Sequence, residues 1–164
     1  MALNQRLRRL FDENEVSHEV FPHREVFTAD EVAKSSHVAG ALFAKPIIIH
    51  ESESRWYMAI VSAPQHVDLS TIHRMTGRPR GRLATEEEIR RLFPDCEVGA
   101  MPPFGWLYGM PMYIDSEFRR NSDIWFQAGN HREVVQMRFA DYERFAGPFA
   151  GELTLHREEE TVGS

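Results

Sequence analysis

Two apolar segments, separated by a short polar one, constrain the fold of this chain more than any other feature of its sequence. Residues 43–50 contain the β-branched run Ile47-Ile48-Ile49, which is typical of a buried strand. Residues 56–61 form a second apolar strand, and the polar residues 52–55 supply the turn between the two. The sequence therefore predicts a β-hairpin close to the centre of the fold.

The rest of the chain alternates between helical and extended patterns. Apolar residues at helical spacing predict an opening helix that ends at Asn14-Glu15, and capping boxes predict helix starts at Thr28 and Thr85. Asp68 can cap a further short helix. Extended segments are predicted at 19–21, 112–114, 124–127 and 134–137, and a last helix at 139–145. No repeat or linker is present, so one α+β domain over residues 1–150 with a polar tail at 151–164 is the simplest account.

Composition excludes several classes of protein. The single cysteine, Cys96, rules out an internal disulfide and a cysteine-rich zinc site. No apolar run is long enough to span a bilayer, and the first residues do not resemble a signal peptide. We therefore expect a cytoplasmic protein with no membrane partner.

Charge argues against sequence-blind binding to nucleic acid and gives no support to a DNA-binding role. The net charge is −6, whereas such binding depends on a basic excess. Four arginines nevertheless fall within nine residues, at positions 74, 78, 80 and 82, beside His73. They could meet an RNA backbone, although the cluster alone favours a solvated loop.

No familiar catalytic or phosphate-binding motif is present. The chain has no glycine-rich phosphate loop, no dinucleotide fingerprint, no nucleophile elbow and no His-Glu-x-x-His. These classes of site can be set aside, although a metal site made from scattered His and Asp residues stays open.

Lys45 is the first candidate functional residue, because it stands at the mouth of an apolar strand. Lysine rarely occupies such a place without a partner. Its stem could lie along the sheet edge while the amine reaches water. Alternatively, the amine could be a positioned cation directed at a phosphate or at a developing negative charge.

The second candidate is the loop at residues 99–105, Gly-Ala-Met-Pro-Pro-Phe-Gly, within an irregular segment at 98–109. Glycine allows unusual dihedral angles and proline stiffens the exit, so successive backbone N–H groups can point into a pocket. Such groups hold a carbonyl oxygen or orient a water molecule. An ordinary rigid connection is the alternative.

The third candidate is the strand-to-strand turn at residues 128–133, which contains Gly129 and His131. Imidazole is well suited to proton transfer near neutrality, so His131 could orient water or a substrate hydroxyl. An exposed turn histidine is the alternative.

Taken in order, six segments resemble the YbaK/prolyl-tRNA-synthetase-associated editing domains. They lie at residues 21–33, 44–48, 67–69, 83–88, 96–105 and 128–135. The likeness covers roughly residues 15–146, and it is the order and spacing of the segments that make it specific.

This resemblance implies a mixed, largely antiparallel, barrel-like sheet surrounded by helices, with no metal and no organic cofactor. It implies hydrolysis of the ester that joins a wrong amino acid to the 3′ end of a tRNA, and it leaves open an aminoacyl-tRNA synthetase as a second partner. The family's key lysine corresponds to Lys45, and its Gly-x-x-x-Pro loop to Gly99 and Pro103. Pro46, Met101 and Pro102 depart from residues that many members carry, so the identity of the amino acid stays open.

The corresponding mechanism needs no strong nucleophile, because an aminoacyl ester is already labile. Lys45 would engage the terminal adenosine, backbone N–H groups at 99–103 would stabilise the oxyanion, and His131 would orient the attacking water. The expected substrate-binding residues are Phe27, Thr28, Phe43, Ala100, Met101, Pro102 and Gly129. Core packing is the alternative for Phe27, Phe43 and Met101.

Two other functions stay open at this point. The domain could bind an aminoacyl end or a synthetase without hydrolysing anything. It could also hydrolyse a different small ester or thioester, in which case the tRNA part of the substrate would be dispensable.

Overall fold

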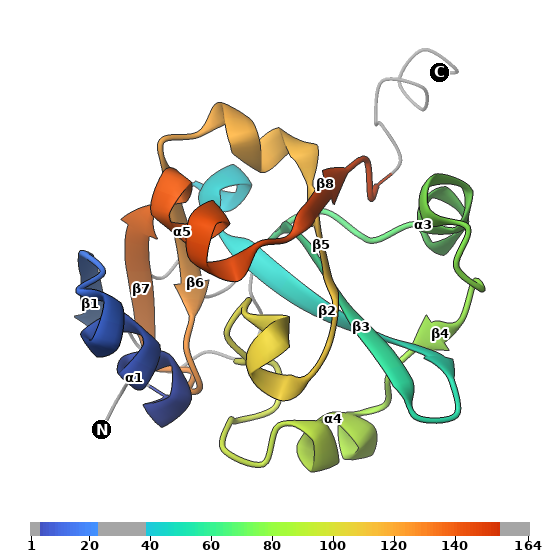
Figure 1. Cartoon of the computed structure of the whole chain (residues 1–164), viewed down its shortest axis with the longest axis horizontal. Helices are drawn as coiled ribbons and strands as arrows, with labels where there is room; N and C mark the ends of the chain where they lie inside the picture. Colours follow the sequence, from blue (N-terminus) through green and yellow to red (C-terminus); the bar gives the residue numbers. More distant parts are fainter. Residues whose placement is uncertain (1–3, 23–38, 155–164) are drawn as a thin grey trace.

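The computed structural model describes residues 4–22 and 39–154 of the 164-residue chain. The helix start predicted at Thr28 and the candidate residues Phe27 and Thr28 lie outside these described residues. Figure 1 shows a long central hairpin with smaller elements at both of its ends.

The central hairpin confirms the prediction from the two apolar segments. Strand β2 (Ala44–Ser52) pairs antiparallel with β3 (Arg55–Ser62), and Lys45 faces Val61 in the register. Side chains alternate between the two faces of a strand. Ile48 therefore enters the main core, whereas its neighbour Ile49 joins a second cluster on the opposite face.

Eight strands form two sheets within the described residues. Besides β2 and β3, the strands are β1 (His18–Pro22), β4 (Arg82–Leu83), β5 (Met112–Asp115), β6 (Asp123–Gln127), β7 (Glu133–Arg138) and β8 (Phe149–Gly151). One sheet has the order β4-β2-β3-β5-β8, and the other has the order β1-β7-β6. The β3–β5 and β5–β8 pairs are parallel and the remaining pairs are antiparallel, which confirms a mixed, largely antiparallel arrangement.

The two sheets meet at a parallel bridge between Phe43 and Trp125. Within the described part of the chain they form no closed sheet, so the barrel-like shape is not confirmed. Closure requires continuous pairing around a ring. Here β2 departs from β6 after the bridge and takes β4 as its next neighbour on that edge.

Helices cover the sheets on several sides. They are α1 (Gln5–Asn14), α3 (Leu69–Thr76), α4 (Glu86–Leu92) and α5 (Phe139–Ala146), with the 3₁₀ helices η1 (Gly40–Leu42), η2 (Gly105–Tyr108) and η3 (Ser116–Arg120). In Figure 1, α1 lies beside the three-stranded sheet and α3 lies at the opposite side of the molecule. Among the described helices, none is long and apolar enough to cross a membrane.

Local sequence signals account for most helix boundaries. Thr85 and Glu88 form the predicted capping box, and Asp68 caps α3 by accepting from the Ser70 amide. Helix α1 ends where predicted, with Glu15 in the left-handed conformation at φ 51°. The irregular segment at 98–109 differs from expectation, because it contains the short helix η2.

The packed part of the chain extends beyond residue 150. Strand β8 includes Gly151, and the Leu153 side chain is fully buried. The Leu153 carbonyl accepts from the Asp68 amide at 2.7 Å, and its own amide donates to the Asp115 carboxylate at 3.2 Å. The polar tail that the sequence predicts from 151 therefore has its first residues inside the fold, and residues 155–164 lie outside the described part.

Candidate active site

Lys45 lies near the start of β2 with its side chain half-buried. Its Nζ donates hydrogen bonds to the carbonyl oxygens of Ala63, at 3.0 Å, and Gln65, at 2.5 Å. The amine is therefore held against the segment that follows β3, which does not match a lysine that simply extends from a sheet edge into water. An open groove of about 620 Å³ begins at this segment, with Gln65, His66 and Ser70 in its wall.

Pro46, next to the lysine, fits into β2 without loss of a hydrogen bond to β3. The Ala63 amide donates to the Phe43 carbonyl at 2.9 Å, so residues 43 and 63 form a hydrogen-bonded pair. Such pairs alternate in an antiparallel ladder, which makes Pro46 and Ile60 a non-bonded pair. The proline nitrogen thus points away from β3, where its missing N–H is tolerated.

Three carbonyl groups fix the loop that starts at Gly99, and all three accept hydrogen bonds from the β6–β7 region. The Val98 carbonyl accepts from His131 Nε2 at 2.7 Å, and the Gly99 carbonyl accepts from Gln127 Nε2 at 3.3 Å. The Ala100 carbonyl accepts from the Gly129 amide at 2.7 Å. With its carbonyls directed at the turn, the loop is held in a single orientation.

Some backbone amides of the same loop donate hydrogen bonds within the protein, and others have no strong acceptor there. The Ala100 amide donates to the Glu97 carbonyl at 3.0 Å, and positions 102 and 103 are prolines without an N–H. The Gly99 amide, at a residue with φ 88°, meets only the weak acceptor Met101 Sδ, at 3.3 Å. The Met101 amide has no acceptor within residues 4–22 and 39–154. Gly99 and Met101 are consequently the amides that remain for a ligand.

The far end of the loop is anchored in the core. The buried Tyr142 hydroxyl donates to the Pro103 carbonyl at 2.7 Å, and burial raises the pKa of Tyr142 well above its usual value. Phe104 follows directly and is fully buried. This end of the loop is thus fixed by packing, whereas the Gly99 end is exposed.

His131 is buried, with only 3% of its surface exposed, so it is not an exposed turn histidine. A carbonyl oxygen can only accept, so the bond to Val98 requires a hydrogen on Nε2 and leaves the lone pair of the neutral ring on Nδ1. The His131 amide also donates to the Glu97 carboxylate at 3.2 Å. His131 therefore connects the turn to the loop at two points.

The other predicted site residues occupy different environments. Phe43 is fully buried against Ala63 and Val134. Ala100 and Pro102 are buried within the loop, and Met101 belongs to the main core, which agrees with the core-packing alternative for that residue. Gly129 has φ 112°, and a Cβ there would lie 3.2 Å from the Asn4 Cβ, so this turn needs glycine.

Strand register relates Lys45 to the loop. From the parallel bridge between Phe43 and Trp125, two residues along each strand lead to Lys45 and Gln127. The strands of Lys45 and Gln127 belong to different sheets, and this bridge is the point at which they meet. Gln127 in turn bonds the Gly99 carbonyl. The bridge therefore connects the strand that carries Lys45 with the strand that holds the loop.

Gln127 is a site residue that the sequence reasoning missed. Only 3% of its surface is exposed, its Nε2 is used by Gly99, and its Oε1 has no partner in the described part of the chain. The available signal was a polar residue at the end of an apolar strand, immediately before the predicted turn.

A second groove, of about 850 Å³, has Arg90, Cys96, Gly99 and His131 among its lining residues. Burial raises the pKa of the Cys96 thiol to about 12, and the neighbouring Asp95 charge adds to this shift. The nucleophile would have to be a thiolate. Cys96 is therefore not suited to nucleophilic catalysis at neutral pH.

We predict that Cys96 resists alkylation in the folded protein. Iodoacetamide at pH 8 should modify the native thiol far more slowly than the thiol of protein unfolded in denaturant, because the native pKa of about 12 leaves almost no thiolate. Intact-mass measurement over time, at pH values from 7 to 10, gives the two rates. Equal rates at pH 8 would show that the native thiol has an ordinary pKa.

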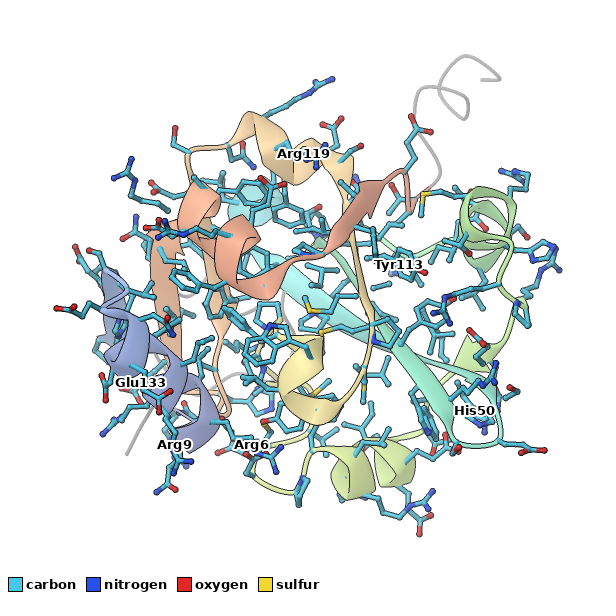
Figure 2. The ribbon with its side chains drawn as sticks, viewed as in Figure 1. Arg6, Arg9, His50, Tyr113, Arg119 and Glu133 are labelled. Atoms are coloured by element: carbon cyan, nitrogen blue, oxygen red, sulfur yellow. The ribbon has the colours of Figure 1, made fainter. Side chains whose placement is uncertain are left out.

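Two arginines of the basic cluster are engaged in ion pairs. Arg78 forms an ion pair with the buried carboxylate of Glu51. The Arg78 Nε also donates a hydrogen bond to the Tyr113 hydroxyl at 2.7 Å. Tyr113 is labelled in Figure 2. Arg82 binds both carboxylate oxygens of Glu88, at 2.9 and 2.8 Å, and this pairing lowers the pKa of Glu88. These two side chains mainly tie the segment after α3 to the rest of the fold.

No group of three or more His, Cys, Asp or Glu side chains within the described residues could hold a metal ion. The loop offers oriented amides, Lys45 on β2 offers a positioned ammonium, and buried polar side chains of other elements hold the loop. Such groups stabilise a carbonyl oxygen that becomes negatively charged.

Comparison with known proteins gives matches over most of the chain. A family model described as an aminoacyl-tRNA editing domain matches residues 23–145. The multifunctional Ser/Thr-tRNA deacylase ProXp-y of Escherichia coli K12 is 30% identical over 149 residues, which cover 88% of this chain and 89% of the relative.

Solved structures agree on the fold. A crystal structure described as a trans-editing enzyme candidate for prolyl-tRNA synthetase superposes with a TM-score of 0.79 at 22% identity, over 93% of this chain and 97% of the other. A structure described only as a hypothetical protein gives a TM-score of 0.81 at 14% identity, over 92% and 99%.

Proposed function

Because this chain belongs to the family of aminoacyl-tRNA editing domains, we propose that it is a stand-alone deacylase that hydrolyses the ester bond of mischarged aminoacyl-tRNA. The reaction returns free tRNA and the wrongly attached amino acid. It corrects a charging error after the synthetase has released its product.

The loop at Gly99 carries the proposal. Its carbonyls at 98, 99 and 100 are held by the β6–β7 region, so the amides of Gly99 and Met101 are the donors available to a ligand. These amides would donate to the ester carbonyl and stabilise the negative charge that develops on its oxygen when water attacks. Removal of one such donor in other enzymes costs about 3–4 kcal/mol of barrier.

Lys45 supplies the second element of the mechanism. Its ammonium is fixed by the carbonyls of Ala63 and Gln65, and its strand meets the strand of Gln127 at the bridge between Phe43 and Trp125. In our proposal it binds the phosphate or ribose of the terminal adenosine and so places the ester against the loop. A pre-positioned ammonium loses little freedom when the substrate arrives, which favours catalysis over simple binding.

His131 has a positioning role in this mechanism. Its Nε2 holds the Val98 carbonyl and its amide holds Glu97, which keeps the loop in register with the turn. Only Nδ1 of the neutral ring would be able to accept a proton or orient water.

The relative from Escherichia coli indicates the substrate class. Its name specifies tRNA charged with serine or threonine. We propose seryl- and threonyl-tRNA as substrates of this chain as well, with alanyl-tRNA as the comparison. A structural neighbour is described in connection with prolyl-tRNA synthetase, so an aminoacyl-tRNA synthetase is proposed as a second partner.

A panel of mischarged tRNAs tests the proposed function. Purified protein is mixed with tRNAs that carry labelled serine, threonine, alanine or proline, and release of each amino acid is followed over time. Seryl- and threonyl-tRNA should be hydrolysed with multiple turnovers. Tight binding without release would instead identify a binding module, and equal hydrolysis of a small aminoacyl ester that lacks tRNA would identify a general esterase.

A further inference from the structure

Gln127 is held in one orientation at the end of β6. Its backbone pairs with Val134 of β7, and only 3% of its surface is exposed. The Gly99 carbonyl can only accept, so the amide nitrogen of Gln127 must be the atom that faces it. The amide oxygen is thereby directed away from the Gly99 carbonyl and cannot exchange places with the nitrogen.

That amide oxygen, Oε1, is a buried acceptor with no partner in residues 4–22 and 39–154. Buried polar atoms in native proteins nearly always have a partner, and an exception is often tied to function. Leucine or methionine would remove this unpaired acceptor but would also leave the Gly99 carbonyl without its Nε2 donor. The Nε2 bond accounts for the amide nitrogen, and the buried oxygen is the part of the side chain that packing and loop positioning do not explain.

The position of the acceptor suggests what it binds. Its own amide nitrogen contacts the loop whose Gly99 and Met101 amides would hold the ester carbonyl. The strand of Gln127 also meets the strand of Lys45, which would hold the terminal nucleotide, at the bridge between Phe43 and Trp125. A donor that reaches Oε1 is consequently part of the amino-acid end of the substrate.

An aminoacyl ester has two kinds of donor near its carbonyl, the α-ammonium and a side-chain hydroxyl. A buried ammonium needs a carboxylate or several acceptors to offset its desolvation, whereas a neutral hydroxyl matches a single neutral amide oxygen. We infer that Gln127 is a specificity-determining residue whose Oε1 accepts a hydrogen bond from the side-chain hydroxyl of the amino acid to be removed. This inference rests on the proposed deacylase function and names the residue that would select the β-hydroxy amino acids proposed above as substrates.

A hydrogen bond to Oε1 would allow the site to reject an amino acid of nearly equal size. A methyl group in place of the hydroxyl would leave Oε1 buried and unpaired in the complex. Sites built to bond a hydroxyl discriminate far more strongly than apolar pockets do, because the unpaired polar group opposes the wrong substrate.

The test compares two substrates on the same tRNA, one carrying serine and one carrying 2-aminobutyrate, which replaces the hydroxyl with a methyl group. The wild-type protein should favour seryl-tRNA by about tenfold or more in kcat/KM. Gln127→Met should bring this ratio close to one. Loss of the Nε2 bond to Gly99 slows both substrates alike, so the ratio isolates the contribution of Oε1.

Gln136→Met is the matched control, because Gln136 lies in β7 of the same sheet and its side chain is only half-buried. It should leave the ratio unchanged. Thermal unfolding establishes that each variant is folded. If Gln127→Met does not fold, Gln127→Asn retains an amide but withdraws it by one methylene, and it should lose the preference in the same way.

Two results would overturn the inference. One is a wild-type ratio near one, and the other is a Gln127 variant that slows both substrates but keeps the ratio, as expected if Oε1 bound the α-ammonium or if Gln127 only positioned the loop. Failure of the proposed deacylase function can be distinguished from both results, because the wild-type protein would then release no amino acid from any charged tRNA.

Discussion

Lys45→Met should reduce kcat for the deacylation of seryl-tRNA by about 100- to 1000-fold, the range seen when one positioned electrostatic donor is removed from an active site. Methionine keeps most of the apolar stem that packs beside β2 and removes only the ammonium. The ammonium is already fixed by the carbonyls of Ala63 and Gln65, so its charge is in place before the substrate binds. Single-turnover kinetics with saturating enzyme measure the chemical step directly.

The same substitution also lowers the stability of the fold, and this effect must be separated from the effect on catalysis. Two charge-assisted bonds to backbone carbonyls are lost, and such bonds contribute about 1.5–3 kcal/mol each at most. The assay is therefore run well below the unfolding midpoint of the variant. Arg120→Met is the matched control, because this arginine is 79% exposed in its side chain and its removal also deletes one positive charge. A Lys45→Met protein with turnover within threefold of the control would exclude Lys45 from the mechanism.

Elements whose signals are local could be predicted from the sequence. The capping box at Thr85 and Glu88 begins α4 because both partners lie within one helical turn. The β2–β3 hairpin follows from two apolar strands and a short polar connection, which the structure reduces to a turn at Glu53 and Ser54. In these cases a stretch of a few residues contains all of the determining interactions.

Elements that depend on distant partners could not be predicted. Strand β4 consists of Arg82 and Leu83 alone, and strand β8 has three residues, so neither shows a periodic pattern. Each exists because an edge strand, β2 or β5, offers it hydrogen bonds. The same reason explains why the expected barrel is not confirmed, since sheet closure is decided by pairing between strands far apart in sequence.

The site also contains features that could be predicted from the sequence and others that could not. The loop at Gly99 and the turn at His131 are recognisable by composition, but the bonds between them span more than 25 residues. Gln127 stands out in the sequence only as a polar residue at the end of an apolar strand, and its distance to the Gly99 carbonyl is what reveals its place beside the loop. Arg78 resembles part of an RNA-binding patch until its partner Glu51, 27 residues away, is identified.

Phe104 is where the loop enters the core, and Phe104→Ala should cause a larger loss of stability than Gln127→Met. The side chain is fully buried, and its ring makes edge-on contacts with Phe11, Phe126 and Tyr142 at centroid distances of 6.1, 5.7 and 5.2 Å. These partners come from α1, β6 and α5, so one ring connects three elements. Truncation of a buried phenylalanine to alanine typically costs about 3–5 kcal/mol.

This loss is large relative to the roughly 5–15 kcal/mol by which a domain of this kind is usually stable. It should lower the thermal midpoint by about 6–20 °C, since each kcal/mol corresponds to about 2–4 °C at this chain length. Differential scanning calorimetry of the variant measures the shift. Phe149→Ala is the matched control, because that ring is 67% exposed and its removal should change the midpoint by only a few degrees.

The position of Phe104 also connects stability to catalysis. It follows Pro103, whose carbonyl is bonded by Tyr142, so a cavity at Phe104 would loosen the anchored end of the loop before the whole fold is lost. At temperatures where Phe104→Ala is still folded, kcat for deacylation should therefore fall, whereas Phe149→Ala should keep the wild-type rate. A Phe104→Ala protein that is strongly destabilised but hydrolyses mischarged tRNA at the wild-type rate would show that the amides of Gly99 and Met101 do not depend on this anchor.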